Sequence, residues 1–370
     1  MLKMFEVYNF RGFDAPVEMN FTAGSYAYNN LAVKDGLVKN AIIYGRNGVG
    51  KSALGIALFD IVSHLTDNER IFKKYVTPYC NQNTGKDVAR FRYVFVLGDE
   101  EIEYEYSKSS PDYLLREKLF SNGELLIDYD YFNSKACYIK AGLVAELNIN
   151  LPDNKLSILK YIYRNTPTNS VPSVSKLISF VERMLWYRSL SDGNNYAGFQ
   201  TGPGLLDEEI YASGKVKDFE SFLKQNGIDY NLTFIVHENN QHFLAVKFDN
   251  ERLVLFDNIA STGTKALRLF FFWNVVAFER VSFLFIDEFD AFLHYESAAS
   301  IVRALNSIGS FQSVLTSHNT YLMRNDLTRP DCCFIMTKNR ITPLCKATDR
   351  VLREGHNLEK LYINGAFTEP

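Results

Sequence analysis

One stretch limits the fold more than any other: GRNGVGKS at residues 45–52, which lies between an apolar run and a helical pattern. The run before it, AIIY at 41–44, is short and fully apolar, as strands buried in a parallel sheet are. Residues 53–65 after it carry apolar side chains at helical spacing. A strand, a glycine-rich loop and a helix in this order indicate an α/β fold whose loop turns its backbone N–H groups around a phosphate.

The residue types of this phosphate loop (residues 45–52) predict ATP and Mg²⁺ as ligands. Gly45, Gly48 and Gly50 can adopt the backbone conformations that tight wrapping demands. Lys51 is expected to reach the β- and γ-phosphates, and Ser52 to ligate Mg²⁺ through its hydroxyl. The remaining expected contacts with ATP come from Arg46, Asn47 and Val49. The competing interpretation is a chance glycine-rich turn, which the flanking strand and helix disfavour.

A second apolar run, FLFIDEFD at 283–290, ends in adjacent carboxylates. If the run is a buried parallel strand, its C-terminal end presents Asp287 as the second anchor of Mg²⁺. Glu288 would then polarise the water that attacks the γ-phosphate. Taken alone, the run also fits a strand that ends in a solvated acidic turn, but the phosphate loop favours the first interpretation.

His318 ends the stretch TSH at 316–318, which follows the apolar run SVL. A helical pattern separates this stretch from Asp287. We therefore expect His318 at the tip of another strand, in line with the γ-phosphate, as a catalytic sensor. A lone histidine is more often structural, and that alternative stays open.

The segment IASTGTKALRLFF, which starts at Ile259, places Ser261, Gly263 and Thr264 before an apolar helix. These residues can cap their own helix. They can also offer a hydroxyl, N–H groups and the helix N-terminus to the γ-phosphate of an ATP held by a second copy of the chain. Both interpretations stay open from the sequence.

Composition and charge restrict the class of protein. Hydrophobic residues make up 46% and charged residues 22%, as in an ordinary folded protein. The net charge of −3 gives no global positive field, so a contact with nucleic acid is possible through a local patch but is not indicated. Because no apolar run of membrane-spanning length and no signal-peptide pattern occur, we expect a cytoplasmic protein without a membrane segment.

The cysteines and histidines give no pattern of metal binding. The five cysteines form no C-x-x-C pair, and we expect reduced and mostly buried thiols at Cys80, Cys137, Cys332, Cys333 and Cys345. His237 and His242 flank a polar stretch between two strand-like runs. A hairpin turn is the expected structure there, in preference to a metal site.

The order of patterns along the chain predicts three parts. Residues 1–150 hold the phosphate loop and an antiparallel β-subdomain, with a hairpin at 91–106 that turns at Gly98 and Asp99. Residues 151–230, with helical stretches such as SKLISFVERMLWYRSL, are expected to be an inserted helical lobe. Residues 231–370 hold strands, helices and the remaining motifs. In the lobe, Trp186 and Tyr187 are expected either to contact a partner or to pack in the lobe's own core.

Taken together, GRNGVGKS, STGTK, FLFIDEFD and TSH resemble the ABC-type ATPase head of the SMC, RecF and OLD group. The pattern is most similar to compact OLD-related AAA ATPases of bacterial phage-defence and abortive-infection systems. VYNFRGF near the start resembles the group's first strand. FDAFLHYE at 289–296 resembles its D-loop, with Asp290 and His294 in the expected places. The resemblance implies an α/β P-loop head with an antiparallel β-subdomain.

The resemblance also implies a homodimer, or a higher oligomer of dimers, that closes on two ATP molecules held between Lys51 of one copy and Ser261 and Gly263 of the other. The sequence departs from the group in three ways: it lacks a clear Q-loop glutamine, it has STGT in place of SGGQ, and it lacks long heptad arms. The residues after His318 lack the strand-framed acidic cluster of a nuclease, although Asp326, Asp331, Asp349 and Glu354 occur there.

The expected function is therefore a slow ATPase that regulates a separate effector, such as a nuclease, in an anti-phage system. The alternative is a RecF-like DNA-repair ATPase that clamps duplex DNA. Its modest basic candidates are Arg70, Lys73, Lys74, Lys215 and Lys217, and solvated faces explain them more simply. A third possibility is a nucleotide-dependent scaffold that hardly hydrolyses ATP.

Overall fold

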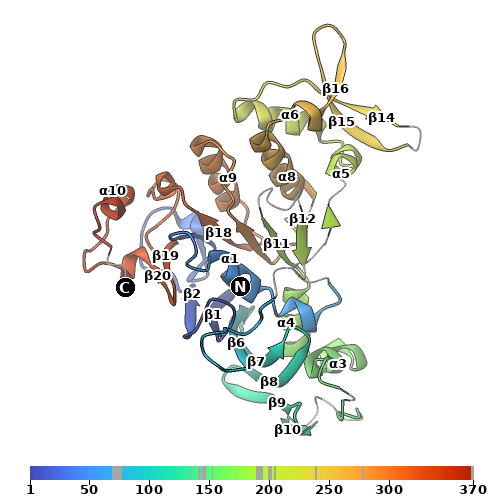
Figure 1. The fold of residues 1–370 in the computed structure, drawn as a ribbon, viewed down its shortest axis with the longest axis vertical. Helices are drawn as coiled ribbons and strands as arrows, with labels where there is room; N and C mark the ends of the chain where they lie inside the picture. Colours follow the sequence, from blue (N-terminus) through green and yellow to red (C-terminus); the bar gives the residue numbers. More distant parts are fainter. Residues whose placement is uncertain are drawn as a thin grey trace.

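Two large sheets form the body of the molecule in the computed structural model (Figure 1). The structure describes residues 1–68, 77–133, 135–140, 143, 147–151, 153–188, 195–198, 202–203, 206–237, 240–276 and 279–367. The expected candidates Arg70, Lys73 and Lys74 lie outside these ranges. The two sheets share the N-terminal part of the chain, because strand β1 belongs to one sheet and β5 to the other.

The central sheet has the strand order β13-β12-β11-β17-β18-β5-β19-β20. Its parallel strands are β11 (Met184–Arg188), β17 (Phe283–Asp287), β18 (Gln312–Ser317), β5 (Asn40–Tyr44) and β19 (Cys333–Thr337). Its antiparallel edges are β12 (Asn195–Gly198), β13 (Gly202–Pro203) and β20 (Arg340–Pro343). The strands expected at 41–44, 281–286 and 313–316 are thus confirmed. Because parallel strands end at the same edge, the segments after β5, β18, β17 and β11 meet there.

The second sheet is antiparallel and confirms the expected β-subdomain. Strands β6 (Ala89–Leu97) and β7 (Glu100–Ser110) form a hairpin whose turn contains Gly98, with a φ of 73° in the region that favours glycine. In sheet order the strands are β10 (Lys135–Ile139), β9 (Glu124–Asp130), β8 (Tyr113–Ser121), β7 (Glu100–Ser110), β6 (Ala89–Leu97), β1 (Leu2–Tyr8) and β2 (Val17–Asn20).

Apolar side chains pack on both faces of the central sheet because neighbouring residues of a strand point to opposite sides. Phe283 and Phe285 of β17 belong to the core that also holds the antiparallel sheet and helix α1 (Lys51–Leu58). Leu284 and Ile286 belong to the other core, beneath helices α8 (Thr262–Val276) and α9 (Tyr295–Ser307). The layers are therefore the antiparallel sheet with α1, the central sheet, and α8 with α9 (Figure 1).

The helix after the phosphate loop is shorter than the sequence predicts. Helix α1 ends at Leu58 and α2 (Val62–Leu65) follows after a turn. Asp60 lies in this turn, where its carboxylate accepts hydrogen bonds from Lys108 Nζ at 2.7 Å and from the Tyr106 hydroxyl at 3.0 Å. The single helix expected over 53–65 is wrong in this detail, because a buried ion pair with strand β7 holds Asp60 in a turn.

The stretch SKLISFVERMLWYRSL holds a helix followed by a strand, not one helix. Helix α4 (Pro172–Val181) follows α3 (Ile158–Asn165), and β11 then runs parallel to β17 in the central sheet. The helix prediction across Met184–Arg188 is therefore wrong, since a short apolar run fits a buried parallel strand as well as a helix. Trp186 and Tyr187 are only 2% and 3% exposed and face the two opposite cores of the protein. Because both side chains are buried, the contact with a partner protein that the sequence left open for them is excluded.

A smaller lobe covers the end of α8 and contains a separate three-stranded sheet (Figure 1). Its elements are α5 (Leu206–Ala212), α6 (Val216–Gln225), β14 (Leu232–Val236), β15 (His242–Lys247), β16 (Leu253–Leu255) and α7 (Phe256–Ile259). Strands β14 and β15 pair with Val236 opposite His242, which confirms the expected hairpin. His242 Nδ1 lies 2.9 Å from Glu208 Oε1, so this histidine has a structural partner. The domain limits proposed at 150 and 230 stay a prediction.

The remaining elements are short. They are β3 (Val33–Lys34), β4 (Leu37–Val38), α10 (Leu358–Ile363) and the 3-10 helices at Asn30–Ala32, Thr168–Ser170, Thr320–Leu322 and Leu344–Lys346. Among the described residues, no helix combines the length and the apolar character needed to cross a membrane. All cysteines are free, and Cys332 and Cys333 are fully buried as expected, whereas Cys137 is exposed.

Candidate nucleotide site

The phosphate loop, Asp287, Glu288 and His318 meet at the C-terminal edge of the central sheet. The register places Ser317 of β18 opposite Tyr44 of β5, just before His318 and the phosphate loop. On the other side of β18, strand β17 ends in Asp287, and Glu288 follows. The sheet thus brings together segments that lie more than two hundred residues apart in the sequence.

The phosphate loop is held in shape by contacts that only glycine permits. Gly50 has a φ of 109°, and a Cβ atom there would lie 2.8 Å from Phe13 Cε1. A Cβ atom on Gly45 would lie 2.6 Å from the carbonyl oxygen of Met336. Residues 46–48 between them are exposed, so their backbone is accessible to a ligand. The loop is thus anchored on both sides and open in the middle.

Lys51 begins helix α1 and is buried, with its side chain folded over the loop. Its Nζ donates hydrogen bonds to the carbonyl oxygens of Gly45 at 2.8 Å and Arg46 at 3.1 Å. Burial lowers the pKa of Lys51, and the charges of Asp287 and Glu288 oppose this effect. The ammonium group therefore lies within the electrostatic reach of the acidic pair. Ser52 follows in the first turn of α1 and is half-buried.

Asp287 fits the role of a metal ligand. Its side chain is buried, and Oδ1 accepts a hydrogen bond from Thr316 Oγ1 at 2.7 Å. Oδ2 is buried as well, with Arg188 Nε at 3.6 Å, but it receives no hydrogen bond from the described residues. Such an unsatisfied carboxylate oxygen is costly unless a cation binds it. Ser52 and Asp287 are the residues that could hold Mg²⁺ here.

Glu288 is held by its backbone, and its side chain is left partly exposed. Its φ is 50°, a left-handed conformation that is uncommon for a residue other than glycine. Its backbone N–H donates to Thr316 Oγ1 at 2.7 Å. Thr316 therefore fixes both carboxylate residues from the neighbouring strand, and the strained backbone is typical of a functional position.

His318 is exposed and follows directly after β18. Partial burial lowers its pKa, and the charge of Lys51 lowers it further, while Asp290, Glu288 and Asp287 oppose the shift. The lowered pKa favours the neutral imidazole, which lies within the electrostatic reach of Lys51 and the acidic residues. Next to it, Ser317 Oγ donates to Asp290 Oδ2 at 2.7 Å and links the strand to the D-loop.

The signature segment (residues 261–264) lies at the start of helix α8. Ser261 Oγ accepts a hydrogen bond from the Thr264 N–H at 3.2 Å, so Ser261 caps helix α8, as one interpretation expected. A Cβ atom on Gly263 would lie 2.6 Å from the carbonyl oxygen of Phe292, so this glycine permits close packing on the D-loop. Ser261 itself is exposed. Its proposed contact with ATP in a second copy stays a prediction.

Arg188 is a residue of this site that the sequence did not reveal. It ends β11 opposite Asp287, and its Nη2 donates to Glu288 Oε1 at 2.8 Å. It was missed because residues 184–188 were interpreted as helix. The signal that could have found it is the apolar run MLWY followed by a charged residue, the same pattern that identified Asp287.

The chain matches a known family over most of its length. The matching family model is described as "AAA domain, putative AbiEii toxin, Type IV TA system", and it covers residues 41–324. The chain belongs to this family. The match spans the phosphate loop, the signature segment, Asp287, Glu288 and His318. It confirms the predicted relationship to abortive-infection-type AAA ATPases and implies nucleotide binding.

Several solved SMC heads are similar to the chain. The SMC head domain from Thermotoga maritima is 17% identical, with a TM-score of 0.44 over 92% of this chain and 98% of that one. An SMC head bound to the C-terminal winged-helix domain of ScpA is 13% identical, with a TM-score of 0.42 and coverages of 92% and 96%. A third, with an extended coiled coil and a ScpA domain derived from Pyrococcus furiosus, is 12% identical, with a TM-score of 0.44 and coverages of 92% and 95%. None of the curated proteins matches this sequence.

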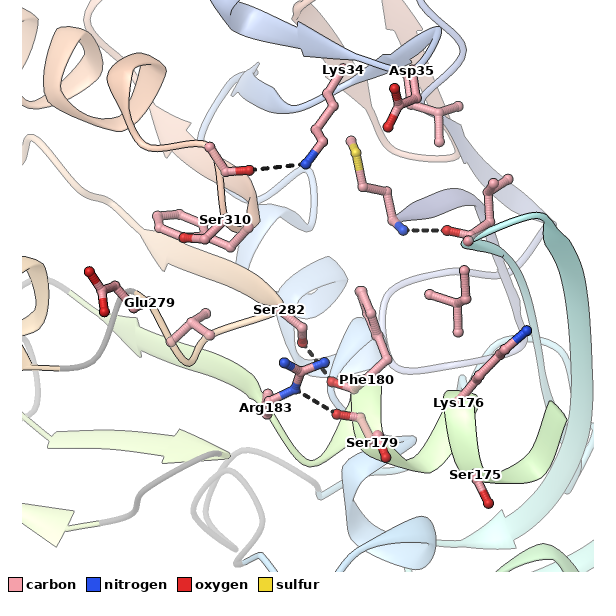
Figure 2. A pocket seen from close by; sticks show the side chains of 18 residues that line it. Lys34, Asp35, Ser175, Lys176, Ser179, Phe180, Arg183, Glu279, Ser282 and Ser310 are labelled. Atoms are coloured by element: carbon pink, nitrogen blue, oxygen red, sulfur yellow. Dashed lines mark hydrogen bonds between the residues drawn. The ribbon is translucent and has the colours of Figure 1, made fainter. Parts of the chain in front are cut away.

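A hollow of about 720 Å³ lies at the opposite edge of the central sheet in this AAA family member, where β17 and β18 begin (Figure 2). Polar groups on its wall already have partners within the chain. Lys34 Nζ donates to the Gly309 carbonyl at 3.3 Å, Ser282 Oγ donates to the Phe180 carbonyl at 2.6 Å, and Arg183 Nε donates to the Ser179 carbonyl at 2.8 Å. The hollow shares no residue with the phosphate loop. Among the described residues, no group of three or more potential metal ligands occurs there or elsewhere.

Helix α8 is tied to the small lobe by a charge cluster around the buried Arg268. Arg268 Nη1 donates to Asp207 Oδ1 at 2.9 Å, and its Nη2 donates to Asp257 Oδ1 at 2.8 Å. Asp257 lies on α7, just before the signature segment, and Asp207 lies on α5. The side chains of Arg268 and Asp207 are 5% and 16% exposed. The position of the signature segment therefore depends on this cluster.

Arg268→Met is expected to lower the free energy of unfolding by about 3 kcal/mol, because Asp207 stays buried without its counter-ion. Burial raises the pKa of Asp207, and Arg268 opposes the rise. Without Arg268 this pKa rises further above the unfolded value of about 3.9. When a carboxyl has a raised pKa in the folded state, the free energy of unfolding falls as the pH rises from the unfolded-state to the folded-state pKa. Relative to wild type, the variant is therefore expected to lose more stability at about pH 8 than at about pH 5. Thermal unfolding of wild type and Arg268→Met at both pH values measures this difference, and the exposed Arg303→Met is the control. Equal losses of stability at the two pH values would contradict the predicted pH dependence.

Proposed function

We propose that this chain binds and slowly hydrolyses ATP, that two copies close on two ATP molecules, and that this cycle controls a separate effector in defence against phage. The observation that carries the proposal is the meeting of Lys51, Asp287, Glu288 and His318 at one edge of the central sheet. These are the groups that phosphoryl transfer to water requires: a cation for the phosphates, a metal ligand, a base and a polar contact for the γ-phosphate.

Each residue has a chemical task in this proposal. The loop N–H groups and Lys51 hold the phosphates, and Ser52 and Asp287 hold Mg²⁺, which neutralises charge on the phosphate oxygens. Glu288 orients and polarises the attacking water from its partly exposed position. The imidazole of His318 would donate a hydrogen bond towards the γ-phosphate, because His318 directly follows β18, the strand between β5 and β17.

The second copy is proposed because the signature segment has what a phosphate contact needs but lies against the D-loop of its own chain. Ser261 is exposed at the start of a fifteen-residue helix, whose N-terminus favours an anion. A head-to-head dimer would bring Ser261 and Gly263 of one copy to the ATP held by Lys51 of the other. Closure on ATP and opening after hydrolysis would then be the switch.

The defence role is proposed from the family description, which names an abortive-infection toxin and a type IV toxin–antitoxin system. A separate effector, such as a nuclease, is proposed because two of the acidic residues considered for a nuclease site have structural partners within the chain. Asp331 pairs with Arg329 and Asp326 pairs with Arg324. Affinity capture of the tagged chain from phage-infected cells should recover an effector or a phage component. Recovery of neither, together with salt-dependent duplex DNA binding that ATP stimulates, would favour the DNA-clamp alternative.

Ser261→Arg is expected to block dimer formation while nucleotide binding stays within about twofold of wild type, because a bulky cation replaces the small hydroxyl at the contact. Light scattering on the gel-filtration peak, with a non-hydrolysable ATP analogue present, measures the mass of each variant. Ser221→Arg, at an exposed position of α6, serves as the control and should dimerise as wild type does. A dimer of unchanged stability in Ser261→Arg would refute the proposed contact.

A further inference from the structure

Arg188 contacts both acidic residues of the nucleotide site. It stands opposite Asp287 in the parallel pairing of β11 with β17, so its side chain leaves the sheet at the same edge. Its Nη2 lies 2.8 Å from Glu288 Oε1, and its Nε lies 3.6 Å from Asp287 Oδ2. The side chain is 25% exposed, so the guanidinium is only partly solvated. The pair is therefore stronger than a fully exposed surface ion pair.

The guanidinium faces the carboxylate oxygen that is left for a metal. Thr316 already donates to Asp287 Oδ1 at 2.7 Å, so Oδ2 is the oxygen with room for another partner. The Arg188 Nε lies 3.6 Å from this oxygen. Magnesium bound by Asp287 would bring two further positive charges next to the guanidinium. Because like charges repel in a partly buried site, Arg188 and magnesium oppose each other there.

Arg188 also pairs with Glu288, the side chain that is proposed to polarise water. A carboxylate oxygen of Glu288 that accepts a charge-assisted hydrogen bond from Arg188 is less available to a water molecule. The strained backbone of Glu288 is fixed by Thr316, so its side chain can change partner without a change of the backbone. The pairing can therefore open when a stronger cation arrives.

We propose that Arg188 is a positioning residue that neutralises Asp287 and Glu288 while the site lacks metal, and that it releases Glu288 when magnesium and nucleotide bind. This inference rests on the proposed function, because it assumes that Asp287 and Glu288 serve magnesium and ATP. It makes two predictions that a purely structural role does not make. Removal of the guanidinium tightens magnesium binding, and it weakens nucleotide binding when magnesium is absent.

The test is a titration of Arg188→Met with a fluorescent, non-hydrolysable ATP analogue over a series of magnesium concentrations. The half-saturating magnesium concentration is expected to fall roughly three- to tenfold, because a positive charge next to the metal ligand is gone. In EDTA, analogue binding is expected to weaken by a similar factor. Arg183→Met, which removes an exposed arginine just before β11, is the matched control and should leave both values unchanged.

Arg188→Lys keeps a positive charge and is expected to stay closer to wild type than Arg188→Met in both measurements, and it provides a second variant if the methionine variant is unstable. If Arg188 instead contacts the γ-phosphate directly, Arg188→Met weakens analogue binding at saturating magnesium and leaves ADP binding unchanged, which would overturn the inference. An unchanged magnesium requirement would overturn it as well. Absence of analogue binding in the wild-type protein would instead refute the proposed function itself, and the inference with it.

Discussion

Lys51→Ala is expected to abolish ATP binding in practice, with a loss of affinity of about 30-fold or more. The reason is that truncation of one partner of a buried, hydrogen-bonded charge contact costs roughly 2–5 kcal/mol. The Lys51 ammonium is positioned by the Gly45 and Arg46 carbonyls, so its direction is set before the nucleotide arrives. Equilibrium titration with a fluorescent ATP analogue measures the change.

The lysine variant needs a control for folding, because the Gly45 and Arg46 carbonyl oxygens lose a donor. Thermal unfolding should show at most a small decrease, of about 1–2 kcal/mol in the free energy of unfolding. Lys215→Ala removes an exposed lysine of the small lobe and should bind the analogue as wild type does. If the folded Lys51→Ala variant keeps wild-type affinity, the loop does not hold the phosphates in the proposed way.

Glu288→Gln is expected to retain ATP and to lower the turnover rate by roughly 100-fold or more, as loss of a general base does. The amide keeps the shape of the side chain but cannot accept the proton of the attacking water. Because hydrolysis opens the proposed dimer, ATP should trap this variant as a closed dimer. Phosphate release and the mass of the protein by light scattering, each with ATP and Mg²⁺, measure the two effects.

Glu296→Gln is the matched control for the glutamate variant. Glu296 is exposed in the first turn of α9, at the C-terminal end of the segment that resembles a D-loop, and its loss should leave turnover nearly unchanged. Unchanged turnover in Glu288→Gln would refute its role as the water-polarising residue. Slow turnover in the wild-type protein that survives this substitution would favour a nucleotide-dependent scaffold instead.

Motifs that are encoded locally could be predicted from the sequence. The strand, loop and helix around GRNGVGKS depend on an apolar run, on glycines with unusual backbone angles and on a lysine at the helix start, all within one short segment. Strands β17 and β18 were predicted for the same reason, because short apolar runs before polar residues are typical of buried parallel strands.

The positions of Arg188 and of the residues around it could not be predicted in this way. The run MLWY by itself fits a helix or a strand. It is a strand in the folded protein because it pairs with β17 in the central sheet. This pairing buries Trp186 and Tyr187 on opposite faces and places Arg188 beside Glu288. The turn at Asp60 has the same origin, since its partner Lys108 lies on a distant strand.

The sequence by itself determined which residues can hold a triphosphate and a metal, because each of those groups sits in a short motif whose backbone conformation is set by its own residue types. The tertiary structure alone decided that Arg188 contacts the acidic pair. Arg188 and Glu288 lie a hundred positions apart in the chain. Their contact exists because two parallel strands end at the same edge of one sheet.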